Sequence, residues 1–348
     1  MTCMFDNRFF KRFCRERNIR ESTASGYESA LKHYLKFHKK SLDELMAEAK
    51  QDEEDMVPLK DRRIKKRLLN YRSYLLKSNC SPNTVRTYFT KVKTFYIHFD
   101  IEIPHLPDAK YNKLYETNYL DLPTKEHIRK ACDSVPVDLK AVILFMSSSG
   151  TAKAETLSLK VDQFIQGTSA YHNGGSLDVI LETLSHKRNV VPTFYLKRIK
   201  TDKYYYTFCS PEATKYIVKY LQSRKDLKLS DNLFDFTASG LLNKFQEIND
   251  RMGWGFKGKY RFFRAHTLRK FHASNIGLAA EYIDELQGRS KNYVHSTYIK
   301  TNPNKLKSIY KSAMSNVMIY NLDEPEVVNQ EFTIVINVFL AGKEYNIL

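Results

Sequence analysis

The sequence has few cysteines and no long apolar run. Its five cysteines lie far apart, form no Cys-x-x-Cys pair and are odd in number, so we expect neither a zinc site nor a disulfide framework. No stretch of ~18 apolar residues occurs that could span a membrane, and charged residues near the N-terminus interrupt any signal-peptide core. We therefore expect a reduced, soluble protein of the cytoplasm.

Two signatures of metal-dependent and nucleotide-dependent enzymes are also missing from the sequence. No Asp-x-Asp or Asp-Asp-Glu-like cluster stands out that would hold two metal ions. No Gly-x-x-x-x-Gly-Lys-Ser/Thr loop is present that would bind the phosphates of ATP. The sequence therefore gives no sign of a two-metal site or of an ATP-binding loop.

What the chain does have is a large excess of positive charge. Its 348 residues include 56 Lys and Arg against 39 Asp and Glu, a formal net charge of +17. An excess of this size usually marks a polyanionic partner, and nucleic acid is the leading candidate. The alternative is a merely basic protein. The length favours two domains, because single cores stop growing near ~250–300 residues.

Residues 1–102 are predicted to form a helical domain. Aromatic residues and leucines recur at helical spacing across residues 22–40, with lysines on the other faces. A further helix is predicted over residues 60–77. The acidic run at residues 52–55 interrupts the basic pattern, and we expect it to be a solvated loop between helices.

The last helix of this domain has a clear start. Ser81 can cap it, Pro82 suits its first turn, and an apolar stripe follows. Several basic residues of the predicted helices lie outside the apolar stripes and are candidates for contact with DNA. They are Lys32, Lys36, Arg86, Lys91 and Lys93.

A proline-containing linker is predicted over residues 103–123, followed by a second domain over residues 124–320. Its first helices begin at Thr124 and end at Gly150. Between residues 178 and 210 the pattern changes to β-branched and aromatic runs, which favour a small antiparallel sheet. The expected strands are residues 179–181, 190–199 and 204–209. The predicted fold is mostly α with a small antiparallel β-sheet.

The remaining tail, residues 321–348, includes a stretch of strand composition at residues 332–339. Its alternation of apolar and polar residues is poor. Such a segment can pair with a sheet edge of its own chain or of a neighbouring molecule.

The side chains most suited to chemistry lie between residues 266 and 298. His266 and Arg269 stand three apart on a predicted helix, so both can reach one phosphate. The alternative for such a pair is an exposed helix face without a function. Gly288-Arg289 follows about twenty residues later, and Tyr298 lies nine residues beyond Arg289. A phenol needs positive neighbours to become a nucleophile at neutral pH, and the two arginines are suitable.

This order of residues resembles the tyrosine recombinase (phage integrase) family. The family pattern is a helical His-x-x-Arg, a Gly-His or Gly-basic turn, and a nucleophilic tyrosine nine residues later. The resemblance implies that Tyr298 is the nucleophile and that His266, Arg269 and Arg289 contact the scissile phosphate. Tyr293 and Tyr310 are the nearest competitors for the nucleophile; the family spacing favours Tyr298.

The resemblance extends upstream over most of the chain. Residues 147–164 have the shape of the family's Gly-Leu-Arg-x-x-Glu motif, with Glu155 in place, and residues 198–213 resemble the hairpin that carries the family's lysine. The resemblance implies that Lys200 is the general acid for the departing 5′ oxygen. Lys203 in the same turn is the alternative and a candidate DNA contact.

Two positions depart from the family pattern. Arg289 stands where histidine is most common, and Ala152 stands at the family's first arginine, with Lys153 one position later. A lysine is a point charge and does not replace a bidentate guanidinium. Three explanations stay open: Lys153 is a variant first cation, another arginine such as Arg188 or Arg198 supplies the group, or activity is reduced.

The resemblance implies a site-specific recombinase or integrase that cleaves and rejoins DNA through a 3′-phosphotyrosyl intermediate without metal or ATP. It also implies two domains clamped on double-stranded DNA, a homotetramer on two DNA sites, a monomer or dimer when free, and exchange of C-terminal segments between protomers. A DNA-associated protein of the cytoplasm is expected. The alternatives are a type IB topoisomerase and a non-catalytic or impaired DNA-binding derivative.

Overall fold

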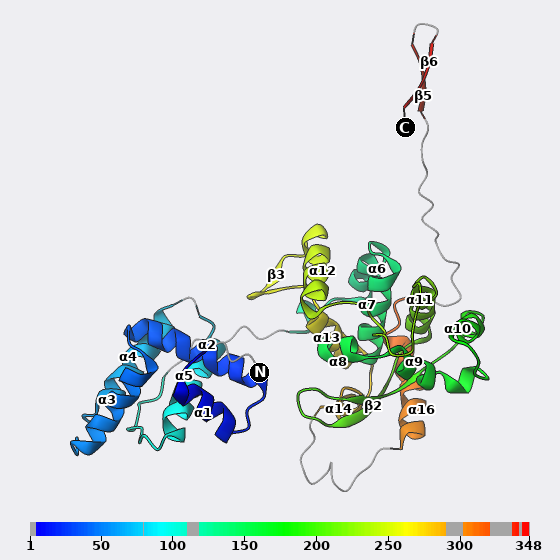
Figure 1. Ribbon diagram of the computed structural model, residues 1–348. Helices are drawn as coiled ribbons and strands as arrows, with labels where there is room; N and C mark the ends of the chain where they lie inside the picture. Colours follow the sequence, from blue (N-terminus) through cyan, green and yellow to red (C-terminus); the bar gives the residue numbers. More distant parts are fainter. Residues whose placement is uncertain are drawn as a thin grey trace. The chain divides into compact units, whose positions relative to one another are not determined.

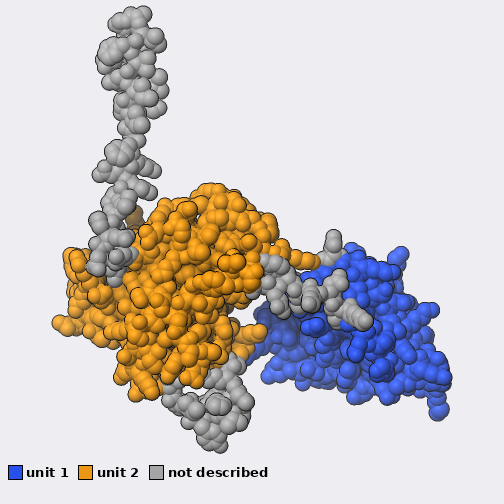
Figure 2. Space-filling model, turned by 180° about the vertical axis from the view of Figure 1, so that it is seen from behind, with its two compact units in different colours: residues 1–116 blue, residues 117–348 orange. Residues whose placement is uncertain are grey.

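The computed structural model of the 348-residue chain divides into two compact units, residues 1–116 and 117–348 (Figures 1 and 2). It describes residues 5–78, 80–109, 118–289 and 302–320, together with the backbone of two strands near the C-terminus. Each unit has its own apolar core, as independent domains do. No helix of the described residues combines the length and the apolar character needed to cross a membrane.

The described part of unit 1 is helical. Helix α5 packs against α2 and α4, and α3 packs against α4. Three tyrosines lie among the largest buried side chains of this core. The Ser81 hydroxyl accepts a hydrogen bond from the amide of Thr84, so the predicted cap of α5 is confirmed. The helices are α1 (Arg8–Glu16), α2 (Glu21–His38), α3 (Leu42–Glu54), α4 (Arg63–Lys77) and α5 (Pro82–His98).

The acidic run at residues 52–55 is not a loop, and this prediction was wrong. Asp52 lies on α3 and is buried, with 4% of its surface exposed. Its carboxylate accepts hydrogen bonds from the backbone amide and the Nε of Arg63, both at 2.7 Å. Arg63 is the first residue of α4, so Asp52 caps that helix from its neighbour and its charge is compensated by the guanidinium.

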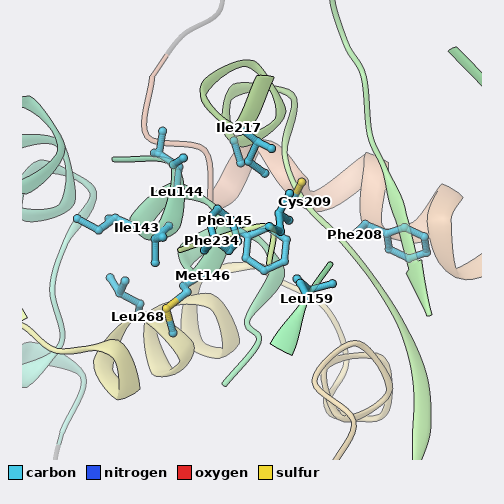
Figure 3. Packing of buried hydrophobic residues seen from close by; sticks show 14 of the residues in the cluster. Ile143, Leu144, Phe145, Met146, Leu159, Phe208, Cys209, Ile217, Phe234 and Leu268 are labelled. Atoms are coloured by element: carbon cyan, nitrogen blue, oxygen red, sulfur yellow. The ribbon is translucent and has the colours of Figure 1, made fainter. Parts of the chain in front are cut away.

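Unit 2 is built around α7, which is buried on nearly all sides and packs against α6, α11 and α13. Figure 3 shows side chains of α7 converging with Leu159, Phe234 and Leu268 in the core. Its helices are η1 (Tyr119–Asp121), α6 (Lys125–Asp133), α7 (Val137–Ser149), α8 (Lys153–Ser158), α9 (Val161–Gly167), η2 (Ser169–Tyr171), α10 (Leu177–Ser185), α11 (Pro211–Gln222), α12 (Ala238–Arg251), α13 (Ala265–Asn275), α14 (Ala280–Leu286), α16 (Pro303–Ala313) and η3 (Met314–Asn316).

The predicted antiparallel pairing is confirmed, since β1 (Thr193–Lys197) pairs with β2 (Tyr204–Phe208). A smaller hairpin joins β3 (Phe256–Lys257) and β4 (Tyr260–Arg261), and in the tail β5 (Ile336–Leu340) pairs with β6 (Lys343–Ile347). The strand expected at residues 179–181 is wrong, because this segment belongs to α10. Buried Ile180, Leu181 and Leu184 there follow the helical spacing.

Contacts between elements bring distant parts of unit 2 together. Helix α14 packs against β2, and α13 packs against α7, which ends at Gly150. The β1–β2 hairpin, the end of α7 and the end of α14 therefore meet around one face of α13. Arg269 of α13 and Arg198 of the hairpin lie at this junction.

Candidate active site

Arg269 lies at the centre of the junction and is buried, with 6% of its surface exposed. Its Nη1 donates to the carbonyl oxygen of Gly150 at 2.6 Å, and its Nη2 donates to that of Gln287 at 2.8 Å. These two residues follow the last turns of α7 and α14. Carbonyls at helix C-termini carry partial negative charge and favour a cation. The guanidinium is therefore held in a fixed orientation.

Two glycines allow the ends of α7 and α14 to pack closely against neighbouring side chains of the site. Gly150 has φ +65°, and a Cβ there would lie 2.5 Å from the His272 Nδ1. Gly288 has φ +59°, and a Cβ there would lie 2.5 Å from a ring carbon of Tyr205. Both the left-handed backbone and the lack of space restrict these positions to glycine. Gly288, which precedes Arg289, therefore allows the end of α14 to pack closely against the ring of Tyr205.

Gln287 connects the parts of the site. Its backbone carbonyl accepts from Arg269 and also from Arg198 Nη1, at 3.1 Å. Its side-chain Nε2 donates to the carbonyl of Arg269 at 3.1 Å and meets the His272 Nδ1 at 3.0 Å. Since the amide nitrogen is a donor, His272 accepts through a neutral ring. Burial, followed by the charges of Arg269 and Arg289, lowers the pKa of His272 to about 3.

The β1–β2 hairpin adds a second guanidinium. Arg198 follows β1, and its side chain is 16% exposed. Its Nη1 lies 3.9 Å from Oε1 of Glu155, a buried carboxylate on α8. Tyr205 of β2 is buried beside these groups, and burial followed by Glu155 raises the pKa of its phenol. Tyr205 is therefore neutral and adds no charge to the site.

His266 and Arg289 complete the described part of the site. Burial and then the cations Arg264, Lys270, Arg269 and Arg289 lower the pKa of His266 to about 4. The imidazole is therefore neutral at pH 7, and the residue keeps an exposed surface that a substrate can reach. Arg289 Nη1 lies 3.5 Å from Asp284 with its side chain 44% exposed.

The lysines considered from the sequence lie in different surroundings. Lys203 Nζ meets the carbonyl oxygen of Arg289 at 3.5 Å, which places it at the edge of the site. Lys200 lies exposed in the hairpin turn. Lys153 Nζ donates to the carbonyl of Ala238 on α12 at 3.0 Å, so it is engaged with another element.

The candidate nucleophile Tyr298 and its competitor Tyr293 lie outside the described residues. The other competitor, Tyr310, is fully buried on α16, and its hydroxyl donates to the carbonyl of Ser148 at 3.0 Å. A phenol packed in the core in this way is closed to a DNA phosphate. The structure therefore argues against Tyr310 as the nucleophile.

The candidate DNA contacts of unit 1 lie at its surface. Lys36 and Arg86 are exposed. Lys32 pairs with Glu28 at 2.7 Å. Lys91 and Lys93 lie over the rings of Tyr27 and Phe89, about 5 Å from the ring centres. Cation–π contacts of this kind hold a lysine stem against the helix and leave its charge near solvent.

Three residues of the site were not singled out from the sequence: Gln287, His272 and Tyr205. Gln287 directly precedes the Gly-Arg pair, and His272 lies three residues after Arg269, on the same helix face. That helical spacing was a usable signal for His272. A carbonyl acceptor such as that of Gln287 has no signature in a sequence. Within the described residues, no group of three His, Cys, Asp or Glu side chains could hold a metal ion.

A scan against protein-family models found no match, and a search of curated proteins by sequence found none. Solved structures do match. A lambda integrase dimer bound to a COC′ core site matches with a TM-score of 0.53 at 14% identity, covering 83% of this chain and 75% of that one. The chain has the fold of a tyrosine recombinase.

Two further structures match with this fold. A shorter lambda integrase dimer on the same kind of core site has a TM-score of 0.51 at 15% identity, covering 84% of this chain and 97% of that one. A Tn1549 transposon integrase in complex with a circular intermediate DNA has a TM-score of 0.50 at 12% identity, covering 87% and 98%. The tyrosine recombinase fold therefore covers most of the chain.

Proposed function

We propose that the protein is a site-specific DNA recombinase that cleaves and rejoins strands through a phosphotyrosyl intermediate. The observation that carries the proposal is the anchoring of Arg269 between two helix ends, with Arg198, Arg289 and His266 around it. The site thus combines three guanidinium groups with a neutral imidazole, and two of the guanidinium groups are held by backbone carbonyls. A phosphodiester is the anion that such a site fits, because guanidinium groups bind phosphate oxygens in a bidentate manner.

The proposed reaction is a transesterification at phosphorus. The phenol oxygen of Tyr298 attacks the scissile phosphate and forms a 3′-phosphotyrosyl bond, while the bond to the 5′ oxygen breaks. Lys200 supplies the proton to that oxygen, and Arg269, Arg289 and His266 stabilise the charge of the transition state. The phosphotyrosyl bond keeps the energy of the broken linkage, so attack by a 5′-hydroxyl reverses the step without ATP.

The proposed partner is double-stranded DNA, bound by both units through the basic residues described above. Recombination joins two duplexes, and we propose a homotetramer on two DNA sites. The integrase structures that share the fold are bound to DNA, one of them as a tetramer on a Holliday junction. Exchange of residues 321–348 between protomers is part of this proposal.

Covalent trapping tests the proposed function. A target duplex is first selected from a randomised library by binding, and a nick is then placed so that the cleaved strand loses a short fragment. We expect the purified protein to form a covalent DNA adduct that Tyr298→Phe abolishes. Absence of any adduct on a tightly bound target would overturn the catalytic proposal and leave a DNA-binding derivative. An adduct that survives Tyr298→Phe would assign the nucleophile elsewhere.

A further inference from the structure

We propose that Arg198, on the β1–β2 hairpin, supplies the guanidinium that helix α8 lacks at Ala152, and that it binds the scissile phosphate together with Arg269. The inference rests on the proposed function and assigns a catalytic residue to it. Of the three explanations for the missing arginine, the geometry favours the one in which another arginine supplies the group.

The first observation is that two guanidinium groups share one acceptor. Arg198 Nη1 and Arg269 Nη2 donate to the same carbonyl oxygen of Gln287, at 3.1 and 2.8 Å. Two donors on one oxygen lie within a few ångströms of each other. A phosphate that reaches Arg269 is therefore within reach of Arg198 as well.

The second observation concerns charge. Burial, and then the positive charge of Arg198, lowers the pKa of Arg269 to about 10. Two neighbouring cations repel each other, and the carbonyl that they share carries only a partial charge. Glu155, at 3.9 Å from Arg198, compensates one of them. A phosphodiester between the two guanidinium groups would relieve the repulsion, so the pair is suited to an anionic ligand.

The other candidates for the missing group do not meet Arg269 in this way. Ala152 presents only a methyl group, and Lys153 donates to the carbonyl of Ala238 on α12. Arg188 is exposed in the segment that precedes β1. Among the described residues that we considered for the missing group, Arg198 is the one that shares an acceptor with Arg269.

The hairpin fixes the direction of Arg198. Its backbone amide donates to the carbonyl of Lys203 at 2.7 Å, which closes the turn beyond the strands. Side chains alternate along β1, with Phe194 and Leu196 buried and Tyr195 and Lys197 exposed. Arg198 continues the buried side of the strand. Its neighbour Lys197 lies on the other side and pairs with Asp202 at 3.1 Å.

This alternation provides a matched control for the test. Lys197→Ala removes one positive charge from the same hairpin on the solvent side, whereas Arg198→Ala removes it on the side of the site. Single-turnover cleavage of the nicked target duplex is measured for both variants and for the wild type. We expect Arg198→Ala to slow cleavage by about 10²–10³-fold, Arg198→Lys to restore part of the rate, and Lys197→Ala to cleave close to the wild-type rate.

A second substrate separates phosphate binding from a merely structural role. In a methylphosphonate, a methyl group replaces one nonbridging oxygen and removes the negative charge that a guanidinium would neutralise. If Arg198 binds that oxygen, the loss caused by Arg198→Ala shrinks to within ~10-fold on this substrate, whereas a structural defect lowers both rates equally. Thermal unfolding and DNA affinity of the variant are compared with those of the wild type.

The outcomes distinguish the inference from the function on which it rests. Cleavage by the wild type together with undiminished cleavage by Arg198→Ala overturns the role of Arg198 and leaves the recombinase proposal in place. An equal loss on both substrates also overturns it and makes Arg198 a structural residue. Failure of the wild type to form any adduct overturns the proposed function itself.

Discussion

At the residue scale, two guanidinium groups of the site, those of Arg198 and Arg269, are held by backbone carbonyls. His266, Arg269 and Arg289 follow a recognisable order, and the structure places them within electrostatic reach of one another. The anchors are backbone carbonyls of Gly150 and Gln287. Any residue carries a carbonyl, so such acceptors leave no pattern in a sequence. The same holds for Arg198, whose role depends on the packing of a hairpin against a distant helix.

Gly288 gives a prediction at this scale. Gly288→Ala places a Cβ 2.5 Å from the Tyr205 ring in a left-handed conformation at φ +59°. Gly253→Ala is the matched control, because Gly253 has φ +64° and a Cβ there would meet nothing within 4 Å. We expect the control to lose ~1–2 kcal/mol of unfolding free energy from the backbone alone and Gly288→Ala to lose clearly more. Urea unfolding measures both, and equal losses would contradict the packing argument.

Because His272 is buried and neutral, we expect the protein to lose stability in acid. Its pKa is about 3 in the folded protein and ~6.5 when unfolded, so below pH 6.5 the unfolded chain binds the additional proton. The free energy of unfolding is therefore unaffected by this group above pH 6.5. It falls as the pH drops toward 3, and the loss is about 2 kcal/mol at pH 5. His272→Asn keeps an acceptor for Gln287 and removes the titration. Urea unfolding at pH 7.5 and 5.0 should show the larger drop in the wild type; an equal drop in both proteins refutes the assignment.

At the element scale, helix ends were predictable and interiors were less so. Ser81, Thr124, Ser210 and Gly150 cap helices as their residue types indicate, because capping depends on local backbone geometry. Residues 179–181 were predicted to be a strand because a short apolar run has the same pattern in a buried strand and in a buried helix. The acidic run at residues 52–55 was misread because the partner of Asp52 lies on the next helix, 11 residues away in sequence.

Asp52 provides the prediction for this scale. Asp52→Ala removes the cap of α4 and leaves the amide and Nε of Arg63 without their acceptor. We expect a loss of about 1–3 kcal/mol in unfolding free energy. Glu54→Ala, at an exposed position on the same helix, should change it by less than ~0.5 kcal/mol. Chemical denaturation of the full chain measures both values, and similar losses would mean that Asp52 is not a cap.

At the scale of the whole molecule, charge and fold lead to the same proposed partner. The net charge of +17 was evident from composition, whereas the fold covers most of the chain at identities too low for a sequence match. The division into two units follows from two separate apolar cores. Composition suggests that a polyanion binds, and under the proposed function the arginines of unit 2 would contact its phosphate.

Salt dependence tests the proposed DNA binding by the whole chain. Neutralising phosphates releases condensed counterions, so the logarithm of the DNA association constant should fall linearly with the logarithm of salt concentration. With ~6–10 phosphates contacted, the slope is about −5 to −9 on B-form DNA. Lys36, exposed on α2, is a candidate phosphate contact, and Lys36→Ala should reduce the slope by ~1 without changing sequence preference. Fluorescence anisotropy with a labelled duplex between about 50 and 200 mM salt measures the slope, and a flat response excludes extensive contact with the phosphate backbone.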